Sequence, residues 1–223
     1  MKSTIQDKAK LVNSVFSKVY NKYDLMNDVM SLGIHRIWKD KFIDWMNPSP
    51  SSSLIDVASG TGDIAKKFSL RNKNLSMITC VEPNKDMFKK GKSNLVNFKN
   101  IKWIMSRAES LPVEDNMYDF YTISYGIRNV SDINKALKEA YRVLKPGGRF
   151  MCLEFSKIDN EFINFVYKNY SKALPILGKY IVGSSKPYEY LINSIDAFYS
   201  QEQLVELMTK NGFSNVEYRN LSN

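Results

Sequence analysis

The stretch Leu54–Ala65, LIDVASGTGDIA, decides the fold of this 223-residue chain. Its first part, Leu54–Ala58, is typical of a short buried strand, and Asp63–Leu70 is typical of a helix. Between them lies the SGTG turn at positions 59–62, where glycines let the backbone approach a ligand closely. The helix N-terminus adds a partial positive charge beside this turn. The sequence therefore predicts a site for a nucleotide-like ligand above the carboxyl end of the strand.

The spacing of the two glycines differs from the dinucleotide-binding fingerprint. Only Thr61 separates Gly60 from Gly62, and no third glycine follows at the spacing that the fingerprint requires. The next predicted strand, Met77–Val81, is followed by Glu82. An acid at the end of the second strand can accept hydrogen bonds from both ribose hydroxyls, although an exposed acid at a strand end is the alternative. We predict that the glycine turn and Glu82 bind the cofactor.

Strand and helix patterns alternate through the middle of the chain, which implies a parallel sheet with helices on both faces. We therefore expect a single α/β domain with a doubly wound, mostly parallel sheet. The KPGG sequence at 145–148 ends a helix, because proline and paired glycines break helices. The remaining expected strands are 101–105, 118–124 and 150–155, the remaining expected helices are 85–94, 133–144 and 201–211, and a last strand begins at 216–218.

Four regions of this domain differ in pattern. We expect a helical N-terminal cap over residues 1–48, interrupted near Asn27 and Gly33, and a cofactor-binding α/β core over residues 53–155. Residues 160–200 are expected to form a substrate-side helical segment, and residues 201–223 a terminal helix and strand. Aromatic side chains in the third region are typical of a core, and they also suit a tunnel for an apolar substrate.

Composition narrows the possible functions. The net charge of +9 suits nucleic acid, an anionic membrane or an anionic ligand, and solvated helix faces are the plain alternative. Aromatic residues are not interleaved with the lysine runs, so we expect no nucleic-acid partner. The chain has one histidine, His35, and its two cysteines, Cys80 and Cys152, lie in separate apolar runs. We therefore expect reduced core thiols and no metal site.

No stretch approaches the roughly 20 apolar residues that a membrane span needs, and the first ten residues lack the apolar core of a secretion signal. The expected location is cytoplasmic or peripheral to a membrane.

The chain resembles the ubiquinone/menaquinone biosynthesis C-methyltransferases, which are class I S-adenosylmethionine-dependent methyltransferases. The glycine turn and LKPGG occur across many methyltransferases, whereas the N-terminal block and GIRNV are specific to this family. The resemblance covers almost the whole chain and rests on VFSKVYNKYDLMNDVMSLGIHRIWK (15–39), DVASGTGDIA (56–65), AESLPVEDNMYD (108–119), TISYGIRNV (122–130), YRVLKPGGRFMCLEFSK (141–157) and YLINSIDAFYSQEQLVELMTKNGF (190–213).

The resemblance implies transfer of a methyl group from S-adenosylmethionine to a ring carbon of a polyprenylated benzoquinol or demethylmenaquinol, with S-adenosylhomocysteine as the other product. By position, the family's cofactor contacts fall on Thr61, Glu82, Arg107, Ala108 and Ser124. Either quinone pathway fits. Methylation of another small aromatic or lipid, and a non-catalytic scaffold of a quinone-synthesis complex, are the alternative functions.

The sequence departs from the family at several places. Glu82 stands where Asp is usual, and Arg107 stands where Asn is common, so only the backbone part of that contact carries over. Ser59 is a mild change in the glycine turn. Relatives continue past the position of Asn223 with a further apolar strand and a basic tail, so the final strand of the sheet is expected to be missing.

Arg128 and Asn129, which follow the fourth strand, are the candidate catalytic residues. The phenol of a quinol has a pKa near 10, so its ionisation needs a base or a nearby cation. Arg128 can stabilise the phenolate, or it can form a structural ion pair. Asn129 can bind a quinol oxygen, or it can cap the next turn.

The specific N-terminal block supplies further candidates. Tyr23, Asp24 and Asn27 are expected to close the site over the cofactor, although Asp24 alternatively caps a helix. His35 is either a general base or a structural residue, and the structural role is the more common one for a lone histidine.

Because a polyprenyl quinol is almost insoluble in water, we expect peripheral contact with an anionic membrane surface. In a eukaryote this surface would be the matrix side of the inner mitochondrial membrane. A homodimer or a quinone-synthesis complex are partners that the sequence leaves open.

Overall fold

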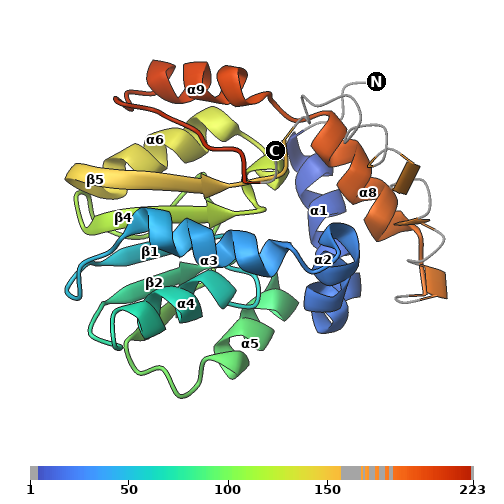
Figure 1. The fold of residues 1–223 in the computed structure, drawn as a ribbon, viewed down its shortest axis with the longest axis horizontal. Coiled ribbons are helices and arrows are strands. Elements are labelled where there is room, and N and C mark those ends of the chain that lie inside the picture. The colour runs from blue at the N-terminus through green and yellow to red at the C-terminus, as the bar shows by residue number, and fades with distance from the viewer. Residues whose placement is uncertain are drawn as a thin grey trace.

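The computed structural model describes residues 5–156, 167, 169–170, 174–175, 179–180 and 183–221. Its centre is a five-stranded parallel sheet in the order β3-β2-β1-β4-β5, with helices on both faces (Figure 1). The predicted doubly wound α/β fold is confirmed. The strands are β1 (Leu54–Val57), β2 (Ile78–Val81), β3 (Ile101–Ile104), β4 (Tyr118–Ser124) and β5 (Leu144–Leu153).

Helices cover the sheet and the ends of its strands. The elements before the sheet are α1 (Ile5–Val19), the 3-10 turn η1 (Tyr20–Lys22), α2 (Tyr23–Ser31) and α3 (His35–Met46). Those within and after it are α4 (Asp63–Arg71), α5 (Lys85–Asn94), η2 (Ile127–Asn129), α6 (Ile133–Val143), α8 (Lys186–Asp196) and α9 (Gln201–Lys210).

Strand β1 lies at the middle of the sheet, and every one of its residues is buried. It pairs in parallel with β2 and with β4, so it has a strand on each side. Because helices cover both faces of the sheet, its side chains are shielded from water. This position explains the continuous run of apolar residues, which is typical of a strand in a parallel sheet. Asp56 is the exception, and Thr122 of β4 donates a 2.7 Å hydrogen bond to its carboxylate.

Each face of the sheet has its own apolar core. On one face, α6 and α9 contribute Leu137, Val143 and Met208. On the other, α3 and α4 contribute Phe42 and Phe68, and Figure 1 shows these two pairs of helices on opposite sides of the strands. Both faces are therefore sealed by helices.

A third apolar cluster joins the N-terminal cap to α8. Val19 and Met26 from the cap pack with Tyr188, Leu191 and other residues of α8. Figure 1 shows α1, α2 and α8 grouped beyond the carboxyl ends of the strands. The cap and α8 therefore lie together over the edge of the sheet where open α/β proteins bind ligands.

Three details differ from the sequence prediction: the break near Asn27, the start of β5 and the strand at Val216–Tyr218. The break near Gly33 is present, but the break predicted near Asn27 is wrong, because α2 continues through it and the chain instead bends at η1. Strand β5 begins at Leu144, earlier than predicted, and a register shift against β4 accommodates the glycines that follow.

The strand predicted at Val216–Tyr218 is wrong. This segment is irregular, and it makes no ladder with β5. Side chains hold it instead, since Phe213 and Val216 pack on the core under α9 and the Arg219 guanidinium lies 4.3 Å from the centre of the Trp45 ring. Within the described residues, no helix is long and apolar enough to cross a membrane.

Replacing Gly91 with Ala should destabilise the fold. An added Cβ would lie 2.2 Å from a Trp103 ring carbon and 2.8 Å from the Gly60 carbonyl oxygen, so α5 would have to move away from the glycine turn. We expect a loss of about 1–3 kcal/mol of unfolding free energy, despite the helix propensity that alanine adds.

Urea unfolding measures this loss. Lys92→Ala, at the exposed neighbouring position, is the matched control and should change stability by less than about 0.5 kcal/mol. A Gly91→Ala variant as stable as the unchanged protein would show that α5 does not constrain the turn.

Candidate cofactor and active site

The carboxyl ends of β1 and β4 carry strained residues. Ala58, after β1, has φ +54°, and Tyr125, after β4, also has φ +54°. Non-glycine residues rarely adopt this left-handed conformation, and such residues cluster at ligand sites. The two strands are neighbours at the point where the strand order reverses, which is where open α/β sheets bind ligands.

The glycine turn is held by the acid after β2. Gly60 N–H donates a 2.9 Å hydrogen bond to one oxygen of Glu82, and Asn84 N–H donates a 2.9 Å bond to the other. Gly60 and Gly62 both have positive φ, and Gly62 forms the N-cap of α4. Glu82 therefore joins the end of β2 to the turn after β1.

Glu82 is buried, so the alternative of an exposed acid at a strand end is wrong. Burial raises the pKa of its carboxyl to about 7, against the two backbone donors that favour the ionised form. Each carboxylate oxygen accepts one backbone N–H and has capacity for a further donor. The side chain can thus accept two ribose hydroxyls without losing its own contacts.

A cavity of about 400 Å³ lies above these strand ends. This volume is within the range of small-molecule sites. Helix α1 and Tyr23 contribute to its wall, as expected for the N-terminal cap. Of the residues predicted from the sequence, the cavity brings together Gly60, Glu82, Arg107, Ala108, Ser124 and Asn129.

Ser124 provides an independent sign of a ligand. Its hydroxyl is buried, it lines the cavity, and it makes no hydrogen bond to any other described residue. A buried hydroxyl without a partner is costly, so a polar ligand group in the cavity would stabilise it. The residues present therefore fit a nucleoside cofactor.

Thr61 and Gly62 lie on the other side of the turn. They line a smaller cavity, of about 300 Å³, together with His35 and Asp63. His35 contacts the Ser31 hydroxyl through Nδ1 at 2.9 Å, and it is buried away from the cofactor cavity. This position favours the structural role for His35.

The loop after β3 closes one side of the cofactor cavity. Ala108 is buried there, whereas the Arg107 side chain is half-exposed and donates a 2.6 Å bond to the Ser131 hydroxyl. Arg107 thus ties this loop to the segment after β4. Its side chain already has protein partners in Ser131 and Glu109, so the backbone contact expected at this position stays a prediction.

Arg128 forms a buried ion pair with Glu154, which follows β5. The Arg128 guanidinium also donates a 2.9 Å bond to the Tyr125 carbonyl and a 3.2 Å bond to the Ser194 hydroxyl. The structural ion pair considered from the sequence is therefore present. Arg128 lines a groove beside α1 and α8, next to the cofactor cavity.

Sequence reasoning missed Glu154. Burial raises the pKa of this carboxyl, while Arg128 and the backbone N–H groups of Phe155 and Arg128 favour the ionised form. The predicted strand 150–155 included Glu154, whereas β5 ends at Leu153, so Glu154 follows its strand as Glu82 follows β2.

Asn129 lines the cofactor cavity and does not cap α6. Its carbonyl oxygen accepts a 2.7 Å bond from the Tyr190 hydroxyl, and its amide donates a 3.3 Å bond to the Tyr125 carbonyl. The N-cap of α6 is Asp132, whose side chain accepts from the Lys135 N–H. The capping alternative for Asn129 is therefore wrong.

The remaining N-terminal candidates are partly described. Asn27 is buried. Burial raises the pKa of the Tyr23 hydroxyl. The Asp24 side chain lies outside the described residues.

The aromatic residues predicted to serve both as core and as tunnel lining have several environments. Tyr188 is fully buried in the cluster between the cap and α8, and Tyr170 packs against that cluster. Tyr190 lines the groove beside α1, and Tyr180 is exposed. Phe162 and Phe165 lie outside the described residues.

Cys80 and Cys152 are free thiols, as predicted. In the part of the chain that the structure describes, no group of histidine, cysteine and acidic side chains could hold a metal ion.

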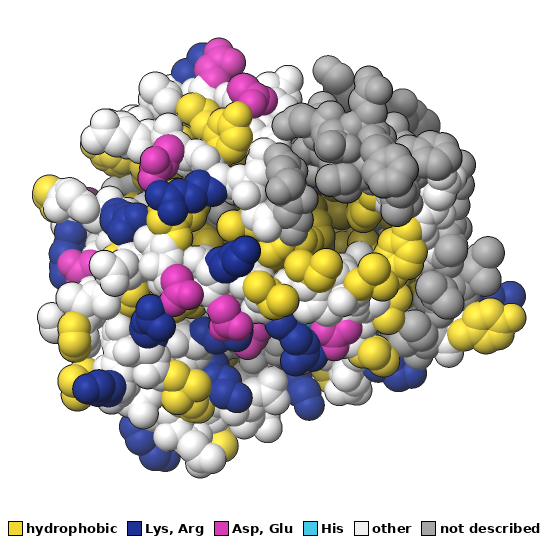
Figure 2. Space-filling model, in the orientation of Figure 1, with side chains coloured by type: hydrophobic (Ala, Val, Ile, Leu, Met, Phe, Trp, Pro, Cys, Tyr) yellow, Lys and Arg dark blue, Asp and Glu magenta, His cyan; other side chains and the backbone are white. Residues whose placement is uncertain are grey.

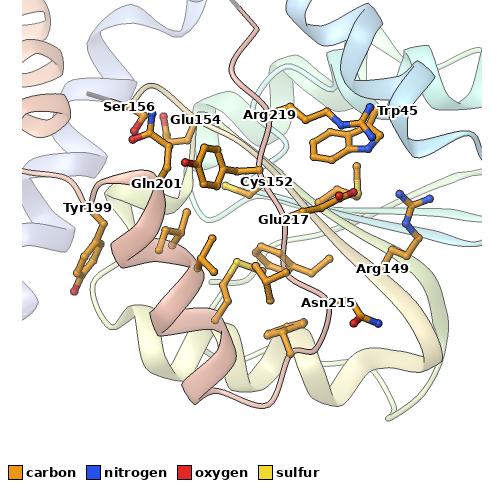
Figure 3. A pocket seen from close by; sticks show the side chains of 18 of the residues that line it. Trp45, Arg149, Cys152, Glu154, Ser156, Tyr199, Gln201, Asn215, Glu217 and Arg219 are labelled. Carbon is orange, nitrogen blue, oxygen red and sulfur yellow. The ribbon is translucent and has the colours of Figure 1, made fainter. Parts of the chain in front are cut away.

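Another cavity, of about 420 Å³, lies between β5, α9 and the C-terminal segment. Figure 3 shows Trp45 beside Arg219 at one end of it and Tyr199 at the other. None of the predicted cofactor residues lines this cavity, so it is separate from the cofactor site.

Several solved structures with this fold are methyltransferases. The chain aligns with a SAM-dependent methyltransferase from Thermotoga maritima at 23% identity and TM-score 0.63, over 92% of this chain and 82% of that one. It also aligns with phosphoethanolamine N-methyltransferase 2 of Haemonchus contortus in complex with S-adenosyl-L-methionine, at 18% identity and TM-score 0.61, over 82% and 38% of the two chains. The fold is therefore that of the class I methyltransferases.

The sequence matches the ubiE/COQ5 methyltransferase family over residues 2–223. A relative from Rickettsia bellii (strain OSU 85-389), named ubiquinone/menaquinone biosynthesis C-methyltransferase UbiE, is 50% identical over 97% of this chain and 90% of its own length. A relative of the same name from Rickettsia prowazekii (strain Madrid E) is 50% identical over 95% and 88%. The chain belongs to the ubiE/COQ5 methyltransferase family and is a methyltransferase, as the resemblance implied.

Two buried acids should make the stability of the free protein depend on pH. Burial raises the pKa of both Asp56 and Glu82 to about 7. Between about pH 4 and pH 7 the folded state therefore binds more protons than the unfolded state, and stability falls as pH rises through that window. Each carboxyl should contribute roughly 3–4 kcal/mol to this fall.

Urea unfolding at a series of pH values measures the slope. Asp56→Asn and Glu82→Gln should each flatten it, whereas Glu114→Gln, at an exposed position, should leave it unchanged. A slope that both buried-site variants retain would exclude these two acids as its source.

Proposed function

We propose that this chain transfers a methyl group from S-adenosylmethionine to a ring carbon of a polyprenylated quinol, in ubiquinone or menaquinone biosynthesis. The observation that carries the proposal is the cavity at the ends of β1, β2 and β4, where the Glu82 carboxylate and the unpartnered Ser124 hydroxyl lie. The name of the Rickettsia relatives supports the quinol as substrate. When bound, the cofactor supplies an electrophilic methyl group.

The cofactor's nucleoside is proposed to lie along the glycine turn. Glu82 accepts the ribose hydroxyls, and the buried Ala108 borders the nucleoside. The Ser124 hydroxyl meets a polar group of the cofactor near the reacting end. Phe16 and Tyr23, whose rings are 5.9 Å apart, cover the cavity from the N-terminal cap and exclude water.

Arg128 and Asn129 are proposed to act on the quinol. The ring carbon becomes nucleophilic when the neighbouring hydroxyl releases its proton to solvent water, and the Arg128 guanidinium stabilises the resulting phenolate. Its ion pair with Glu154 keeps a cation at this buried position. Asn129, on the cavity wall, binds a quinol oxygen and helps align the ring carbon with the methyl group.

A methyl-transfer assay on short-chain demethyl- and demethoxy-quinol analogues tests this function against its alternatives. Methylation of a quinol supports the proposal. Methylation of other small aromatics or lipids alone would favour a different substrate, and cofactor binding without any transfer would favour a scaffold of a quinone-synthesis complex.

Replacing Glu82 with Ala should weaken cofactor binding. The variant removes the acceptor for two ribose hydroxyls, at roughly 1.5–3 kcal/mol for each charge-assisted bond. We expect the affinity for S-adenosylhomocysteine to fall about a hundredfold or more by calorimetric titration.

Glu82→Asp keeps the carboxylate and should retain affinity within about tenfold, while the exposed Glu114→Ala should change nothing. Circular dichroism confirms that each variant is folded. Unchanged affinity in a folded Glu82→Ala variant would contradict the proposal that Glu82 accepts the ribose hydroxyls.

The enzyme is further proposed to collect its quinol at an anionic membrane surface. The net charge of +9 supports an electrostatic attraction, and each basic residue near the surface contributes on the order of 1 kcal/mol. On the face that Figure 2 shows, basic side chains are spread among acidic ones rather than gathered in one patch, and hydrophobic side chains line a hollow. These features favour weak, reversible binding.

Co-sedimentation with anionic vesicles tests this contact. Binding should fall as salt rises from about 0.05 to 0.5 M, because salt screens the charges, and an apolar part should persist. Neutral vesicles provide the control. Absence of binding at low salt would favour delivery of the quinol by a partner protein.

A further inference from the structure

The turn after β4 is folded back on a strained residue. The carbonyl oxygen of Tyr125 accepts bonds from both Arg128, at 2.9 Å, and Asn129, at 3.3 Å. These bonds lie within η2 and its approach, so by themselves they fix the turn and not the far ends of the two side chains. Each side chain needs a second contact to keep one orientation.

Helix α8 provides those second contacts. Tyr190 and Ser194 are one turn apart, so they lie on the same face of the helix. The Tyr190 hydroxyl donates a 2.7 Å bond to the Asn129 carbonyl oxygen, and the Ser194 oxygen accepts a 3.2 Å bond from Arg128 Nε. The Ser194 hydroxyl donates in turn to the Leu191 carbonyl at 2.8 Å, which orients its oxygen toward Arg128.

The Tyr190–Asn129 bond also joins two cavities. Asn129 lines the cofactor cavity, whereas Tyr190, Ser194 and Arg128 line the neighbouring groove of about 1000 Å³ between α1, η2 and α8. Val130 and Ser131 line both. The bond therefore lies at the boundary that a substrate in the groove would share with the cofactor.

We propose that Tyr190 and Ser194 are positioning residues that hold Asn129 and Arg128 toward the reacting atoms, so that docking of α8 completes the active site. Their role rests on the proposed function. Without the Tyr190 hydroxyl, the Asn129 amide keeps, among the described residues, only its long bond to the Tyr125 carbonyl. Without the Ser194 hydroxyl, the guanidinium keeps Glu154 and Tyr125 as partners but loses the contact that fixes its Nε edge.

Tyr190→Phe tests the first contact, because it removes only the hydroxyl. The matched control is Tyr188→Phe on the same helix, where the hydroxyl is buried and has no partner among the described residues. We expect Tyr190→Phe to lower kcat about tenfold, the effect of losing one orienting hydrogen bond, while the Kd for S-adenosylhomocysteine changes by less than about twofold. Tyr188→Phe should keep kcat within about twofold.

Ser194→Ala tests the second contact. It should lower kcat with unchanged cofactor affinity, and Ser194→Thr, which keeps a hydroxyl, should restore most of the loss. Thermal melting of every variant separates these effects from unfolding. A purely structural role would lower stability, and it would not lower kcat while leaving cofactor affinity unchanged.

The outcomes distinguish failure of the positioning role from failure of the proposed function. If the unchanged enzyme methylates a quinol and Tyr190→Phe behaves like Tyr188→Phe, the positioning role is overturned while the proposed function stands. If the unchanged enzyme binds S-adenosylhomocysteine but methylates no quinol, the proposed function fails, and the positioning role fails with it.

Discussion

The hydrogen bond from Gly60 N–H to the Glu82 carboxylate is the contact on which the site depends. It joins the turn after β1 to the end of β2, and Asn84 N–H occupies the other oxygen of the same carboxylate. Gly91 allows α5 to approach the Gly60 carbonyl, so the turn is fixed from two sides. A carboxylate that is buried for this purpose is also placed to meet a ribose.

The same arrangement has an energetic cost. Glu82 and Asp56 are both buried acids near the glycine turn, and one Asp56 oxygen has no hydrogen-bond partner among the described residues. These two buried acids and the strained backbone at Ala58 and Tyr125 all make an unfavourable contribution to the free energy of folding at the ligand-binding edge of the sheet. The two apolar cores on the faces of the sheet, far larger in number of buried side chains, offset them.

On the reaction side, a third buried acid lies at the end of β5. Glu154 pairs with Arg128, which is tied to Tyr125 after β4 and to Ser194 on α8. The ends of two neighbouring strands and a late helix are therefore joined through one guanidinium. Removing either member of the pair would leave a buried charge without its partner, so both members are needed for stability.

The sequence by itself determined the doubly wound α/β class, the glycine turn, the acid after β2 and the family, because these depend on local patterns such as apolar runs, glycine spacing and an acid after a strand. It did not determine that Arg128 pairs with Glu154, that Asn129 bonds to Tyr190, or that Val216–Tyr218 stays irregular. Those outcomes depend on which segments meet across the sheet. Local secondary-structure propensity does not specify contacts between segments far apart in the sequence, so only the tertiary structure decided them.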